Sequence, residues 1–212
     1  MTLIIDDFRE GLDVIFRPAE NASIKLSVGD ALALYYKFSV IPIAIFVIAG
    51  HVFLEILASM FSQSPVSPIT SFFGAHSLTI LVATSVAFFW IFLPVALLVQ
   101  AALYQFLGGT IMGKFKGGYS ATFSSVVFAM LPNVLVAWLA FIPGFDLIIL
   151  PLVSIYGIYV LVIALTKQHK TTNNTAFAVW LVCSVVLWML SIVGSFILSM
   201  FSFFHTLSAL GA

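Results

Sequence analysis

Two long runs without a charged residue dominate this sequence. Residues 78–107 and 119–145 contain no Asp, Glu, Lys or Arg, and a short segment containing Lys114 and Lys116 lies between them. A helix of roughly 20 apolar residues can cross the hydrocarbon core of a bilayer. The two runs therefore predict membrane-spanning helices, joined by a turn that its glycines keep tight.

The composition leaves little room for a water-soluble domain. The 212 residues are 62% hydrophobic and 8% charged, whereas about a quarter of the residues in a soluble domain are charged. We expect an all-α, polytopic integral membrane protein whose main partner is the lipid bilayer. The net charge of zero gives no support for nucleic-acid binding, and a single cysteine, Cys183, excludes an internal disulfide.

The apolar runs divide into five predicted transmembrane helices. These cover residues 38–60, 78–107, 121–142, 145–166 and 176–204. The second would reach roughly 45 Å as a straight helix, so it is expected to tilt, to kink at Pro94 or to project beyond the bilayer. Residues 62–77 are predicted to form a loop, and Pro143-Gly144 a tight turn.

The segment before the first span has a different character. Phe8, Leu12, Ile15 and Phe16 recur at helical spacing among charged residues, and Pro18 is expected to end that helix. This pattern predicts an amphipathic helix that lies in the membrane interface or packs on the protein's own cytoplasmic surface. Ser27 and Asp30 resemble a capping box that begins a helix over residues 31–36. The expected organisation is a preface at 1–37, a membrane domain at 38–204 and a short outer tail at 205–212.

The basic residues predict the orientation. All of them fall on one side of the five-span arrangement: Arg9, Arg17, Lys25, Lys37, Lys114, Lys116, Lys167 and Lys170. Lys and Arg concentrate in cytoplasmic loops, so we expect a cytoplasmic N-terminus and an outside or lumenal C-terminus. The membrane would be the plasma membrane in a prokaryote, or the ER or Golgi in a eukaryote.

Three polar residues within the predicted spans are candidates for an intramembrane site. His51 and Glu55 lie one turn apart on the first span, and Asn133 lies in the middle of the third. A carboxylate inside a membrane costs about 2.5 kcal/mol or more unless it is neutral, paired or hydrated. The residues could form a proton or cation site, or could make structural hydrogen bonds between helices. Gln100, Gln105 and Asn133 could also line a polar cavity, or could hold helices together through hydrogen bonds.

Signatures of catalysis are absent from the sequence. It contains no phosphate-binding loop, nucleophile elbow or zinc-protease motif. His76, Asp146 and His205 map to the outer side with Glu55, but scattered loop residues are a weak basis for a metal site. We expect a protein that is not an enzyme and has no cofactor and no bound metal.

Several short motifs together resemble the YIP family, the five-span Ypt/Rab-interacting membrane proteins. They are Ala33 to Ser39 with Ile41-Pro42, Gly117 to Phe123, Phe128 to Pro132, Ile142 to Gly144, Tyr156 to Tyr159, and His169 with Ala176 before the last span. The resemblance covers most of residues 28–180. It implies a five-span fold and, by analogy with eukaryotic members, binding of prenylated small GTPases in membrane traffic. The short preface is more similar to prokaryotic members.

These observations predict a non-enzymatic membrane scaffold or adaptor that binds protein partners on its cytoplasmic face. The candidate interaction surface consists of Tyr35, Tyr36, Lys114, Lys116, Gly117, Gly118, Tyr119, Lys167, His169 and Lys170. A homo-oligomer is compatible with the sequence. The alternative is a small transporter or channel that uses His51 and Glu55.

Overall fold

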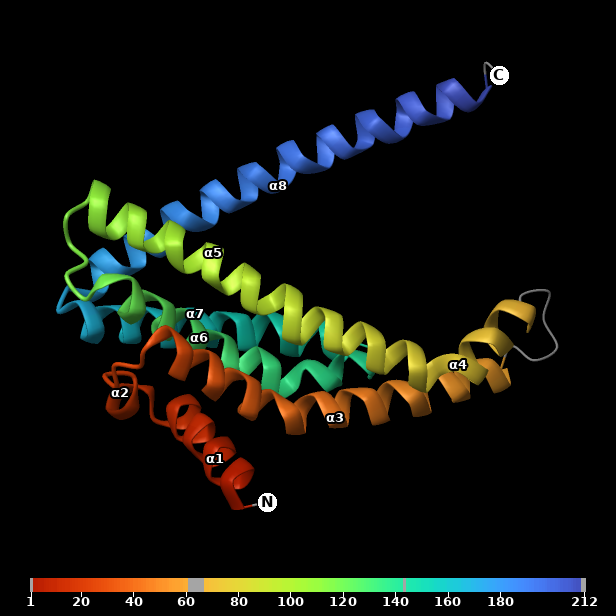
Figure 1. Cartoon of the computed structure of the whole chain (residues 1–212), viewed down its shortest axis with the longest axis horizontal. Helices are drawn as coiled ribbons and strands as arrows, with labels where there is room; N and C mark the ends of the chain where they lie inside the picture. The colour runs from red at the N-terminus through yellow and green to blue at the C-terminus, as the bar shows by residue number, and fades with distance from the viewer. Residues whose placement is uncertain (1, 61–66, 143, 211–212) are drawn as a thin grey trace.

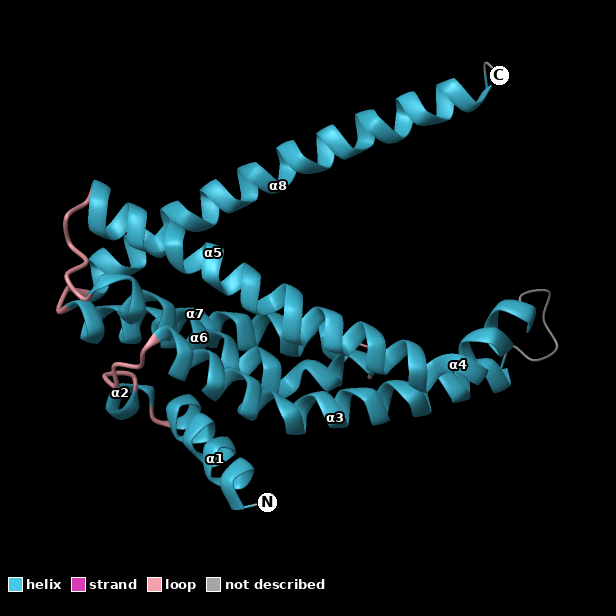
Figure 2. Cartoon of the chain, in the orientation of Figure 1, coloured by secondary structure: helices cyan, strands magenta, loops and turns pink. Residues whose placement is uncertain are grey.

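The structure is a computed structural model that describes residues 2–60, 67–142 and 144–210. Within these ranges the chain is built of helices joined by short loops, and Figure 2 shows no strand among them. The helices are α1 (Thr2–Phe16), α2 (Pro18–Asn21), α3 (Val28–Met60), α4 (Ser67–Ser85), η1 (Val86–Phe92), α5 (Leu93–Gln105), η2 (Phe106–Ile111), α6 (Gly118–Val136), η3 (Ala137–Phe141), α7 (Phe145–His169) and α8 (Asn173–Leu210).

Among the described residues, five stretches are long and apolar enough to cross a membrane, which confirms the all-α polytopic fold. They are Val28–Met60, His76–Ile111, Gly118–Phe141, Leu147–His169 and Asn173–Phe196. The first begins earlier than expected, because α3 runs without a break from the predicted short helix into the predicted span. Pro42 is buried within this continuous helix.

The prediction of a loop at residues 62–77 is partly wrong. Residues 61–66 lie outside the described part of the chain, but α4 already begins at Ser67. Pro68 is the second residue of this helix, and a proline in the first turn is tolerated because its missing N–H would have had no partner there. In the Pro143-Gly144 turn, Pro143 is likewise outside the described residues, and Gly144 adopts a left-handed φ of 85°.

Helix α6 forms the centre of the bundle and packs most extensively on α7, with further contacts to α3 and α5. Residues 121–128 are all buried. Gly157 of α7 permits a close approach to α6, because a Cβ there would come within 2.8 Å of the carbonyl oxygen of Ala129. Small residues allow helix backbones to pack closely in membranes, where dispersion contacts drive helix association.

Helix α1 packs on the bundle. The Phe8 ring stacks on Phe38 of α3 at 5.0 Å between centroids, and Val14 and Ile15 are buried. Phe16 is exposed and ends α1, and Pro18 is the first residue of α2. Of the two interpretations of this amphipathic helix, the contacts favour packing on the protein's own surface.

The predicted start of the next helix is confirmed. Ser27 Oγ accepts a hydrogen bond from the Asp30 backbone N–H at 3.1 Å and donates one to the Asp30 carboxylate at 2.6 Å. An N-cap serine satisfies one of the backbone N–H groups that have no carbonyl partner at the start of a helix.

The second span contains a widened helical turn next to Pro94. The π-helical segment η1 ends at Phe92, just before this proline. Proline has no N–H, so residue 94 can donate neither to the Phe89 carbonyl, its partner in π register, nor to the Trp90 carbonyl, its partner in α register. The irregularity expected near Pro94 therefore takes the form of a π-helical turn, and these carbonyls can accept from side-chain donors.

Tyr35 and Tyr36 supply these donors. The Tyr35 hydroxyl donates to the Phe89 carbonyl at 2.7 Å, and the Tyr36 hydroxyl donates to the Trp90 carbonyl at 3.1 Å. The Tyr35 side chain is 0% exposed. Its assignment to an interaction surface is therefore wrong, because its hydroxyl is committed to the backbone of the neighbouring span.

Helix α8 diverges from the other helices along its length (Figure 1). Its buried residues, Ala176, Val179 and Cys183, lie in its first third. Farther along, Trp188 and Phe196 are exposed. The described bundle therefore packs tightly around α6 and holds α8 only at its beginning.

Candidate functional site

Three segments that are distant in sequence meet at one end of the bundle, where the 112–117 loop and the α7–α8 turn lie in Figure 1. Gln168 at the end of α7 joins two of them. Its Nε2 donates to the Ala22 and Ile24 carbonyls at 3.2 and 3.4 Å, and its Oε1 accepts from Ser124 Oγ at 2.8 Å. Ser120 Oγ donates to the Leu26 carbonyl at 2.6 Å. The preface, the start of α6 and the end of α7 are thus fastened together.

His169 fixes the loop before α6. The Gly117 backbone N–H donates to Nδ1 of His169 at 3.0 Å, so this nitrogen carries no proton and the ring is neutral. Nε2 then carries the proton and donates to Thr122 Oγ1 at 2.9 Å, and the Thr122 hydroxyl donates to Gln105 Oε1 at 2.6 Å. This chain links α5, the 112–117 loop, α6 and α7.

The shape of this loop follows from Gly108 and Phe115. The N–H groups of Lys114 and Phe115 both donate to the Gly108 carbonyl, at 2.8 and 2.9 Å. The Phe115 ring stacks on His169 with centroids 4.2 Å apart. A side chain at Gly108 would collide with that ring, so the close approach requires glycine.

Gly117 and Gly118 serve the same junction. A Cβ on Gly117 would lie 2.7 Å from the Gln168 carbonyl oxygen, and Gly118 has a φ of 77°. A left-handed φ is costly for most other residues. Both glycines therefore shape the loop. The next residue, Tyr119, is half-buried, and its hydroxyl donates to the Leu98 carbonyl at 2.9 Å.

The junction leaves a group of basic side chains in solvent. We call this group the basic end; it consists of Lys25, Lys114, Lys116, Lys167 and Lys170, all exposed. His169 does not belong to such a surface, contrary to the sequence-based assignment. Its side chain is 0% exposed, because it lies under Phe115 and bonds with both ring nitrogens.

The structure places the predicted intramembrane residues in separate contacts. His51 Nδ1 lies 2.6 Å from Ser77 Oγ of α4, and Glu55 is exposed one turn farther along α3. Asn133 Oδ1 of α6 accepts a hydrogen bond from Ser154 Oγ of α7 at 3.3 Å. Among the described residues, no hydrogen bond joins Asn133 to His51 or Glu55.

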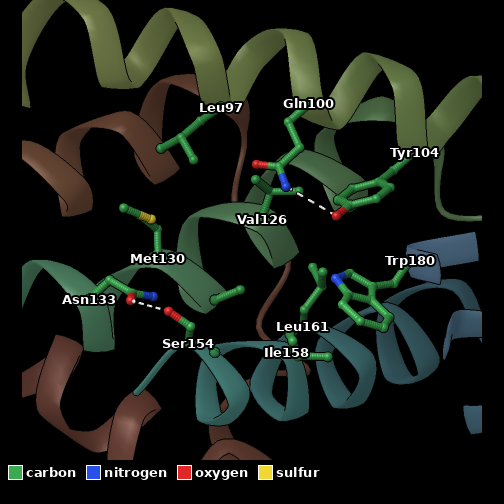
Figure 3. A pocket seen from close by; sticks show the side chains of 12 residues that line it. Leu97, Gln100, Tyr104, Val126, Met130, Asn133, Ser154, Ile158, Leu161 and Trp180 are labelled. Atoms are coloured by element: carbon green, nitrogen blue, oxygen red, sulfur yellow. Dashed lines mark hydrogen bonds between the residues drawn. The ribbon is translucent and has the colours of Figure 1, made fainter. Parts of the chain in front are cut away.

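Asn133 instead borders a small polar cavity of about 140 Å³ (Figure 3). We call this the polar cavity. Its polar wall consists of Gln100, Tyr104, Asn133, Ser154 and Trp180. Gln100 Nε2 donates to the Tyr104 hydroxyl at 3.0 Å. Gln100 and Asn133 could be identified from the sequence as polar residues in apolar runs, whereas nothing in the sequence indicates that Tyr104, Ser154 and Trp180 join them.

No group of three metal-binding side chains occurs among the residues that the structure describes. The side chains of Asp146 and His205, two members of the weak metal candidate, lie outside them.

Comparison with family models, with curated proteins and with solved structures finds no match to this chain.

Proposed function

We propose that this protein is a non-enzymatic membrane scaffold that binds a protein partner at the basic end. The observation that carries the proposal is the junction itself. Three separate segments are tied together by side-chain hydrogen bonds from Gln168, His169 and Ser120, while the lysines around them stay exposed. A fixed backbone that presents exposed positive charges suits recognition of an acidic surface, because the partner need not order the loops when it binds.

The orientation of this end follows from its charge. Loops rich in lysine and arginine remain on the cytoplasmic side during insertion. The proposed partner is therefore a cytoplasmic protein, and small GTPases are the class that the resemblance to the YIP family implies. The basic end would also attract anionic lipid, at about 1 kcal/mol for each lysine near the surface.

The transport alternative has less support. A proton or cation pathway would need titratable groups along one route. His51 bonds to Ser77 on α4, while Asn133 bonds to Ser154 on α7, so their hydrogen bonds lead to different helices. Glu55 is exposed in the C-terminal half of α3.

The test compares how much of a protein partner co-purifies when the lysine charges of the basic end are removed and when they are retained. Lys114, Lys116, Lys167 and Lys170 would be changed together to Gln in one full-length variant and to Arg in a matched control. After mild solubilisation, the co-purifying proteins would be quantified by mass spectrometry. We expect the Gln variant to lose specific partners and the Arg variant to keep them.

Two outcomes would contradict the proposal. Equal capture by the Gln variant would show that the basic end is not the binding surface. If neither the wild type nor the Arg variant retains a specific protein, but both bind anionic vesicles, the lysines serve lipid contact instead.

A further inference from the structure

Two cavities that differ in polarity share one wall inside the bundle. The polar cavity lies between α5, α6, α7 and the beginning of α8. A second cavity of about 470 Å³, here called the apolar cavity, lies between α3, the end of α4, the η1 segment, α6, η3 and α7. Met130 and Asn133 line both. Met130 has an unbranched, flexible side chain that can adapt to neighbouring groups of different shape.

The polar cavity has hydrogen-bonding capacity to spare. The Tyr104 oxygen accepts from Gln100, which leaves the Tyr104 hydroxyl proton for another acceptor. Asn133 accepts from Ser154 through Oδ1, and no acceptor for its Nδ2 occurs among the described residues. In Figure 3 the Gln100–Tyr104 pair and the Asn133–Ser154 pair lie on opposite sides of the cavity. A small polar group between them could bond to both.

The apolar cavity is lined mainly by hydrocarbon and aromatic side chains, including Phe46, Phe88, Phe89 and Val134. One polar group in its wall has no partner. Ser85 is 2% exposed, and its Oγ has no hydrogen-bond partner in the described part of the chain. A buried polar group without a partner costs free energy, so it points to a missing ligand group or solvent molecule.

We propose that the two cavities together bind a single-chain, uncharged amphiphilic lipid of the monoacylglycerol class. The glycerol hydroxyls would occupy the polar cavity, and the hydrocarbon chain would pass Met130 into the apolar cavity, where Ser85 can donate a hydrogen bond to the ester at the start of the chain. Neither set of described lining residues contains Asp, Glu, Lys or Arg, so a charged headgroup would enter without a counter-charge.

Size and access agree with this class of ligand. The polar cavity has the volume of roughly four or five water molecules at about 30 Å³ each, enough for a small head. Phe88 at the rim of the apolar cavity is 55% exposed on a membrane-spanning helix, so a lipid can enter sideways from the bilayer. This site is independent of the basic end.

The test uses the full-length protein in phosphatidylcholine nanodiscs. The probe is a monoacylglycerol with a photoactivatable diazirine in its chain, and the labelled residues are mapped by mass spectrometry. We expect saturable labelling around Phe88 and Met130 that the same monoacylglycerol without the diazirine displaces. A fatty acid with the same diazirine, ionised at neutral pH, should label these positions about tenfold less, because its carboxylate has no counter-charge.

Matched variants separate the site from general lipid contact. Ala137→Phe fills the apolar cavity, whereas Ala102→Phe adds the same side chain at an exposed position outside both cavities. Asn133→Ala removes the shared amide. We expect about tenfold less labelling from Ala137→Phe and from Asn133→Ala, and no change from Ala102→Phe.

Each variant would be used only after its thermal unfolding shows a cooperative transition. Should Asn133→Ala fail to fold, Ala137→Phe and the displacement experiment still decide the question. Labelling that does not saturate, that follows surface exposure along the helices, or that is equal for the fatty acid and the monoacylglycerol would overturn the proposal.

Discussion

The two polar clusters of this bundle differ in how completely they are paired. In the buried junction beneath the basic end, His169 uses both ring nitrogens, and Thr122 connects it to Gln105. Around the polar cavity, Gln100 and Asn133 each take part in one hydrogen bond and retain capacity for more. Both clusters are built from polar residues in apolar helices, so their composition alone does not separate them.

The difference indicates two physical roles. A fully satisfied network in a low-dielectric setting rigidifies the segments it joins, because breaking any member leaves another polar group unpaired. A partly satisfied cluster gains less from its internal bonds and has free groups for a ligand or for water. We therefore expect the first cluster to determine stability and the second to determine binding.

The largest effect is expected at the centre of the paired network. His169→Leu removes both ring nitrogens, which leaves the Gly117 N–H without its acceptor and the Thr122 oxygen without the donor from Nε2. We expect a loss of about 3 kcal/mol in the free energy of unfolding, measured by titrating mixed micelles with denaturing detergent. Lys167→Leu, an exposed neighbour on the same helix, is the control. If His169→Leu and Lys167→Leu unfold with the same free energy, the hydrogen bonds of His169 do not determine stability, and the proposed distinction between the two clusters fails.

A smaller loss is expected at the π-helical turn. Tyr35→Phe deletes the donor to the Phe89 carbonyl and should cost about 2 kcal/mol, because that carbonyl is left buried and unpaired. Pro94→Ala restores a backbone N–H that can bond to this part of the helix. In a double-mutant cycle, Tyr35→Phe should therefore cost less when combined with Pro94→Ala. Additive losses would show that Pro94 is not the reason for this hydrogen bond.

These residues also show how far the sequence could lead. Uncharged runs of sufficient length predicted an all-α membrane fold, because the bilayer leaves a chain few alternatives. The roles of Tyr35 and His169 could not be predicted, because each depends on a partner more than 45 residues away that only helix packing brings near. Pro94 was a usable signal, since it removes a donor, but it does not indicate which side chain will replace it.

The same limit applies to the candidate sites. Asn133 could be identified as a polar residue within a span, yet its neighbour Ser154 belongs to the next helix. The loop predicted at residues 62–77 contains Pro68, which the structure places in the first turn of α4, where a proline is compatible with a helix.

The contrast can be sharpened with single hydrogen bonds. Thr122→Val preserves the shape but removes the link between His169 and Gln105, and we expect a loss of about 1 to 2 kcal/mol. Gln100→Leu in the polar cavity should cost about 0.5 kcal/mol, near the average for a hydrogen bond between membrane helices. The same detergent titration measures both. If Gln100→Leu is the more costly change, the polar cavity contributes to the structure rather than remaining available for a ligand.

The smallest effect is expected at Glu55. This side chain is exposed on α3, and Glu55→Gln keeps its size and its hydrogen-bonding capacity. We expect no measurable change in stability and no change in partner capture. A pH-driven ion flux through the wild-type protein in liposomes that Glu55→Gln abolishes would favour the transport alternative instead.

The most direct test of the scaffold proposal is site-specific photocrosslinking in the cell's own membrane. A photoreactive amino acid would replace Lys114 or Lys170 at the basic end, or Val99 as an exposed apolar position within the second span. We predict discrete protein adducts from positions 114 and 170, and lipid adducts alone from position 99. Lipid adducts alone from all three positions would contradict the proposal that the basic end binds a protein.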